Sequence, residues 1–214
     1  MKNKLKKLVI ALCSVTMLSA LTGCGSFDAQ GYVKASLDCA TKGETAELTN
    51  YVEESEEEMK AIYDDMIASN MAMVPKDSVS EELYNNYEAL FKDIYASAKY
   101  TVGEAEKVDG NYVLTVTVEP LTIFEGYTDL VAEKSQALAT ELTATGTEYT
   151  NDELMEMTYQ VVYDAMSECA AEKTYGEPQD FEITLVRDED KKYILSDSDQ
   201  EAIGSALLDL SDIQ

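Results

Sequence analysis

The spacing of apolar residues along the chain alternates between two periods after residue 28. Apolar residues at every third or fourth position are typical of amphipathic helices, and apolar residues at every second position are typical of half-buried strands. The first spacing predicts helices over residues 29–42, 44–51, 55–74, 78–98, 125–143, 152–173 and 198–210. The second spacing predicts strands over residues 100–108, 111–119, 181–185 and 192–195. Runs of helices separated by hairpins favour a helix-rich α+β fold, in which antiparallel hairpins form a small sheet covered by amphipathic helices.

Capping residues mark several of the predicted helix ends. Asp28 is placed as an N-cap, and Gly43 stands where a left-handed residue ends a helix. Serine or threonine followed three residues later by glutamate forms a capping box, which satisfies two N–H groups at the start of a helix. We predict capping boxes at Ser55/Glu58, Ser78/Glu81, Thr150/Glu153 and Ser198/Glu201.

The dipeptide Asp109–Gly110 joins two alternating stretches and is typical of a two-residue hairpin turn. That turn fixes the register of the two strands. It places Val116 opposite Gly103 and Val118 opposite Thr101, on the face that we expect to be buried.

Small residues on this inner face predict room for a ligand. Gly103 and Ala105 lie beside large apolar residues of the next strand, and the helix that carries Tyr87 and Tyr95 is expected to cover them. We therefore predict an apolar cavity with tyrosine hydroxyl groups at its rim. The alternative is that the helix packs directly onto the small residues and fills the space.

The first 24 residues have the order of a secretory signal. A cationic stretch, 1–7, precedes an uncharged apolar run, 8–21, which is too short to span the bilayer. The run ends in Leu21-Thr22-Gly23-Cys24, which resembles the lipobox of bacterial lipoproteins. We predict a lipoprotein signal peptide over 1–23, an acylated cysteine and short tether over 24–28, and a single α+β domain over 29–214. The alternative is an ordinary secretory signal with a chance cysteine. In the precursor, residues 5–21 are expected to form a helix with few contacts to the domain.

Charge and the absence of histidine exclude several classes of function. The chain has 42 acidic and 16 basic residues and a formal net charge of −26. Nucleic acid is excluded as a partner, because its binding relies on clustered basic side chains and Arg187 is the single arginine. No histidine is present, which removes Ser-His-Asp and Cys-His triads and imidazole zinc ligands. We predict no metal and no cofactor, and paired carboxylates remain as a catalytic chemistry.

The side chains that suggest an ion or redox site are better explained by the helix dipole or by core packing. Glu53–Glu58 lies at a helix start, where solvated acids complement the helix dipole. Met59 and Met66 fall on an apolar helix face, which favours core packing over a copper site. Cys39 and Cys169 also fall on apolar helix faces, so they are either two buried thiols, which we favour, or one disulfide formed after export.

Two resemblances add to the pattern. Residues 32–51, with a helix, the Gly43–Glu44 turn and a short second helix, resemble the start of NTF2-like domains, although the two long helices between the hairpins depart from that family. The chain as a whole, including residues 32–34, 55–58 and 98–106, is similar to uncharacterised lipoproteins of anaerobic Gram-positive bacteria. This similarity implies the compartment and the fold, and it implies no activity.

Our leading hypothesis is therefore an extracytoplasmic lipoprotein, held at the cell membrane by its lipid anchor, that acts as a non-enzymatic binding or interaction module. Its partner would be a small ligand, a peptide or another envelope protein. The first alternative is a carboxylate-dependent hydrolase acting on cell-wall or other glycans, with two acids about 5–10 Å apart. The second alternative is an envelope assembly factor.

Overall fold

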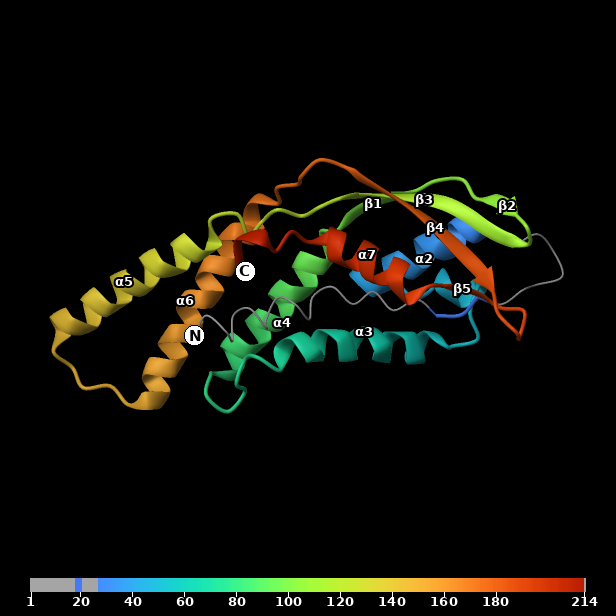
Figure 1. Ribbon diagram of the computed structural model, residues 1–214. Helices are drawn as coiled ribbons and strands as arrows, with labels where there is room; N and C mark the ends of the chain where they lie inside the picture. Colours follow the sequence, from blue (N-terminus) through green and yellow to red (C-terminus); the bar gives the residue numbers. More distant parts are fainter. Residues whose placement is uncertain (1–17, 21–26, 214) are drawn as a thin grey trace.

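The computed structural model describes residues 18–20 and 27–213 of the 214, and it confirms the α+β fold (Figure 1). The stretches with helical spacing form six α-helices within the described residues. These are α2 (Ala29–Lys42), α3 (Glu56–Met71), α4 (Glu81–Ala96), α5 (Tyr127–Thr145), α6 (Asn151–Glu172) and α7 (Asp197–Leu207). The helix predicted over residues 44–51 is reduced to a short 3-10 turn, η2 (Leu48–Asn50), and a second such turn, η3 (Ser211–Ile213), follows α7.

Half of the predicted capping boxes are confirmed. The pairs Ser55/Glu58 and Thr150/Glu153 each form both of their hydrogen bonds, at the starts of α3 and α6. The other two predictions are wrong, because α4 is capped by Ser80 and α7 by Ser196. Ser80 lies two residues after the predicted cap of α4, and Ser196 lies two residues before the predicted cap of α7. Each helix starts at the serine whose hydroxyl accepts a hydrogen bond from the backbone N–H three residues later.

The strands form one antiparallel sheet in which β3 is central. Its members are β1 (Lys99–Val102), β2 (Glu106–Val108), β3 (Asn111–Glu119), β4 (Gln179–Arg187) and β5 (Tyr193–Leu195). The order is β1-β3-β4-β5, and β2 pairs with the other end of β3. Leu114, Val116 and Val118 of β3 are buried as predicted, and Tyr112 is buried on the same face.

The register of the first hairpin is only partly as predicted. The two-residue turn is confirmed, because Val108 pairs with Asn111. On the N-terminal side of β2, however, the chain bulges over residues 103–105. As a result Val102, rather than Gly103, lies opposite Val116. A bulge inserts one extra residue, so the side chains of β1, which precede the bulge, change face. As a result Tyr100, instead of Thr101, points toward the helices.

The helices contribute to two separate hydrophobic cores. The sheet core lies between the sheet and helices α2 and α7, whereas the helical core is formed by α3, α4, α6 and the start of α5 (Figure 1). The expectation that α4 covers the sheet is wrong. Its apolar face packs on α6, where the hydroxyl of Tyr87 donates to the carbonyl oxygen of Tyr159 at 2.6 Å. Helix α4 thus belongs to the helical core together with α3 and α6, and the sheet is covered by α2 and α7.

Cys39 and Cys169 are both free thiols, as favoured above, but only Cys39 is buried and Cys169 is half-buried. Cys39 belongs to the sheet core and Cys169 packs against the helical core, so the two side chains lie in different parts of the molecule. Among the described helices, none combines the length and the apolar character that crossing a membrane requires.

Candidate functional site

The four residues predicted to surround a ligand do not come together. Gly103 and Ala105 lie in the bulge between β1 and β2, where the N–H of Gly103 donates to the carbonyl oxygen of Thr115 at 2.8 Å. Tyr87 and Tyr95 are buried in the helical core. Neither of the two pockets described below is lined by any of the four. The physical reason is that α4 packs against other helices, chiefly α3, α2 and α6, and leaves the sheet surface to α2 and α7.

A pocket with a volume of about 330 Å³ lies between α2 and α3. Its lining is mostly apolar. It consists of Leu18, Ser36, Cys39, Ala40, Leu48, Met59, Ile62, Tyr63, Asp65, Met66 and Ser69. Helix α2 contributes one face and α3 another, since both carry apolar residues at helical spacing.

Ile62 shows why the sequence pattern missed this pocket. It belongs to the apolar stripe of α3, a position that helical spacing predicts to be buried, yet it is 40% exposed. Met59 and Tyr63, its neighbours on the stripe, are buried. The stripe is therefore wider than the core can cover, and its uncovered part forms the pocket wall. The width of the stripe was the signal in the sequence.

The chemistry of this pocket suits binding better than catalysis. Burial raises the pKa of the Cys39 thiol, which keeps it protonated and poorly nucleophilic. Burial likewise raises the pKa of Tyr32, on the neighbouring turn of α2, to about 12, while the Ser36 hydroxyl opposes that shift. With no histidine in the chain to act as a base, the pocket offers an apolar surface edged by hydroxyl groups.

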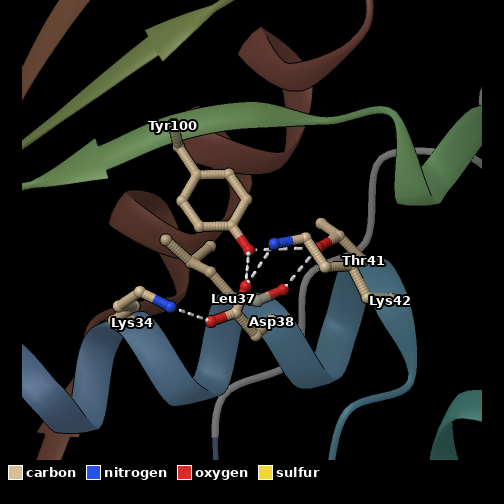
Figure 2. Close-up of polar contacts among 6 residues, drawn as sticks. All are labelled: Lys34, Leu37, Asp38, Thr41, Lys42 and Tyr100. Carbon is tan, nitrogen blue, oxygen red and sulfur yellow. Dashed lines mark hydrogen bonds and ion pairs between the residues drawn. The ribbon is translucent and has the colours of Figure 1, made fainter.

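A charged cluster occupies the opposite side of α2 (Figure 2). The Asp38 carboxylate accepts hydrogen bonds from Lys34 and Lys42 at 2.5 Å each, and from the hydroxyl of Tyr100 at 2.7 Å. Thr41 lies 3.2 Å from the same hydroxyl. The bulge in the first hairpin makes this cluster, because it turns Tyr100 toward α2.

Asp38 has a structural rather than a catalytic environment. Desolvation raises its pKa, but the hydrogen bonds from Lys34, Lys42 and Tyr100 outweigh that effect and the net shift is downward. Glu58 and Glu153 also have lowered pKa values, through their capping-box hydrogen bonds. A glycosidase needs one carboxyl group with a raised pKa to donate a proton. These three acids have the opposite shift.

We expect Asp38→Asn to lower the free energy of unfolding at pH 7 by about 1–3 kcal/mol, because the charge-assisted hydrogen bonds from both lysines are lost. A pKa that is lower in the folded state stabilises the protein above the ordinary aspartate value of 3.8, and this stabilisation is lost as the pH falls through the folded value. Urea titrations between pH 7 and pH 2 should therefore show a difference between wild type and variant that shrinks below pH 4.

Asp64→Asn is the matched control for this measurement. Asp64 forms the same lysine pair at 2.5 Å, with Lys60 four residues away, but its side chain is 46% exposed. Exposed pairs of this kind contribute at most about 0.5 kcal/mol. A loss of stability as large in Asp64→Asn as in Asp38→Asn, or a difference at Asp38 that does not change with pH, would contradict the assignment.

A second pocket, of about 390 Å³, is lined by lysines of three helices. Lys42, Lys60 and Lys92 surround it, together with Gly43, Tyr63, Asp64, Asp93 and Ala96. Each lysine is already paired with a carboxylate four residues away. The positive charge is therefore neutralised locally, and the described residues contain no group of three acids or cysteines arranged to hold a metal ion.

The structure describes only part of the N-terminal segment that was predicted to be the signal peptide and the tether. Cys24 lies outside the described residues, and so does most of the run over 5–21. Where that run is described, the expectation of a helix with few contacts is wrong: Leu18–Ala20 is not helical, and Ala20 is fully buried against Tyr193 of β5. Phe27 and Asp28, predicted as tether, also lie on the domain, with Asp28 capping α2 as expected.

The fold resembles the solved structure of a bacterial protein. It is the crystal structure of a putative lipoprotein, ycdA, from Bacillus subtilis subsp. subtilis str. 168, with a TM-score of 0.56 and 12% sequence identity. The match covers 85% of this chain and 56% of that chain, so this chain spans little more than half the length of the Bacillus protein. No family model matches the sequence, and no curated protein matches it. At this identity the likeness concerns the fold alone.

Proposed function

We propose that the chain is the precursor of a membrane-anchored, extracytoplasmic lipoprotein whose domain binds a ligand or partner without catalysing a reaction. The observation that carries the proposal is the sequence Leu21-Thr22-Gly23-Cys24 behind a cationic and then uncharged N-terminus. The domain begins directly after it, since Phe27 stacks on Tyr193 at 4.7 Å. The shared fold with ycdA supports this compartment.

Binding is favoured over catalysis by the chemistry of the α2–α3 pocket. All of its lining residues except Leu18, which leaves with the signal peptide, remain in the mature protein; they are mostly apolar and include a protonated thiol. The acids with shifted pKa values, such as Asp38, are stabilised in the ionised form. A pocket of this size, with few polar groups, is typical of sites that hold apolar groups.

The test is the chemical state of the N-terminus in a bacterial host that exports lipoproteins. We expect the full chain, residues 1–214, to yield a mature protein that begins at Cys24 and whose first peptide carries the added mass of acyl chains. Protease added to intact cells or spheroplasts should digest the domain. Mature protein that begins elsewhere without acylation, or that is protected inside the cytoplasm, would overturn the proposal.

A further inference from the structure

Leu18–Ala20 fills a slot on the surface of the domain. Ala20 and Tyr193 exchange two backbone hydrogen bonds, in which the N–H of Ala20 donates at 2.8 Å and the N–H of Tyr193 donates at 3.0 Å. The hydroxyl of Tyr32 donates to the carbonyl oxygen of Leu18. Because the segment makes all three hydrogen bonds through its backbone, another peptide in the same extended conformation would make them too.

The slot lies at the edge of the sheet. In the order β1-β3-β4-β5, strand β5 is the last and pairs with β4 on one side. The backbone N–H and carbonyl groups of Tyr193 on its other side are satisfied by Ala20. Without that segment they would form an open edge of the kind to which extended peptides add as a further strand.

The slot also restricts which side chains a bound peptide can carry. Ala20 has no exposed surface, so the space beside Tyr193 is matched to a methyl group. Leu18 lines the α2–α3 pocket. Successive side chains of an extended chain point to opposite sides, so Leu18 and Ala20 face the domain and Ser19 faces away. The slot therefore fits a large apolar residue followed, two positions later, by a small one.

We propose that cleavage before Cys24 opens this slot, and that the mature protein uses it to bind an extended segment of another envelope protein as an added strand on β5. The proposal rests on the function proposed above, because only removal of residues 1–23 frees the slot. Two residues lie between Cys24 and Phe27, which packs on Tyr193, so the three steps of the chain from Cys24 to Phe27 reach about 10 Å when extended. The bound segment would therefore be membrane-proximal.

The experiment measures binding of a fluorescent peptide with the sequence of residues 16–22, by fluorescence anisotropy. The mature lipoprotein, purified in detergent with its N-terminus verified by mass spectrometry, is compared with the uncleaved full chain from cell-free synthesis. We expect the mature protein to bind saturably and the full chain to bind at least about tenfold more weakly, because its own segment competes within the same chain.

Variants of the peptide test the geometry without altering the fold of the protein. Ala20→Pro removes the N–H that donates to Tyr193, and Ala20→Leu enlarges the side chain in the closed space. Each should weaken binding about tenfold or more, whereas Ser19→Thr, at the position that faces away, should leave it within about twofold. In the protein, Tyr32→Phe should weaken binding about fivefold, since it removes one donor.

Two results distinguish failure of the peptide-binding proposal from failure of the lipoprotein proposal. A mature protein with Cys24 at its N-terminus that binds the peptide no better than the full chain, or that binds the Ala20→Pro peptide as well as the parent peptide, would overturn the slot alone. A protein that retains residues 1–23 in the membrane would overturn the proposed function. Because the slot then stays filled, that result would also overturn the proposal that the slot binds a peptide.

Discussion

The Cys24→Ser variant is expected to carry no acyl chain and therefore to lose its lipid anchor. Acylation of a lipobox cysteine takes place on its sulfur, which serine lacks. Each methylene of an acyl chain contributes about 0.8 kcal/mol to membrane binding, so loss of the chains removes the anchoring energy. Palmitate labelling followed by membrane fractionation measures both effects, and the variant should be found as uncleaved precursor or as released soluble protein.

Cys13→Ser and Cys169→Ser are the controls for this experiment. Cys13 lies in the predicted signal peptide and Cys169 is a free thiol of α6, so both variants should be labelled as strongly as wild type. Labelling that persists in Cys24→Ser, or that disappears in Cys169→Ser, would show that the acylated residue has been misplaced.

Phe91→Ala is expected to have the largest effect on stability, lowering the free energy of unfolding by about 3–5 kcal/mol. Phe91 has no exposed surface and lies in the helical core, where its ring is 6.1 Å from that of Tyr87. Truncation removes buried apolar surface and leaves a cavity that the packed helices α4 and α6 cannot close. For a protein of this size the loss corresponds to a decrease in Tm of roughly 6–20 °C.

Urea unfolding followed by circular dichroism measures this loss, with Val108→Ala as the control. Val108 is an apolar residue of β2 whose side chain is 46% exposed, so its truncation should change the free energy of unfolding by less than about 0.5 kcal/mol. Similar midpoints for Phe91→Ala and wild type would show that the helical core does not stabilise the fold as its burial implies.

The local chemistry of the sequence was enough to place most elements. Helix α2 runs from Ala29 to Lys42 as predicted, because Asp28 caps its first turn and Gly43 adopts the left-handed conformation that ends it. The central strand β3 was also predicted from its alternation. Caps and alternation act over a few residues, so the sequence alone contains them.

The binding site was not predictable in the same way. Gly103 and Ala105 were chosen for an inner face that a bulge of one residue moved, and Tyr87 for a helix that packs elsewhere. The residues that line the pocket instead include Ile62, which remains 40% exposed because the core does not cover the full width of the apolar stripe on α3. That the single domain spans residues 29–214, and that its start resembles NTF2-like domains, stay predictions.

The sequence by itself determined the helices and strands, the α+β class and the features that predict a lipid anchor, because capping, periodicity and the lipobox are local. Tertiary structure decided which helix covers the sheet, where the pocket lies and what fills the edge of β5. These depend on competition between apolar surfaces far apart in the chain. Tyr100 illustrates the difference, since one extra residue in a hairpin brought its hydroxyl to Asp38, 62 positions away.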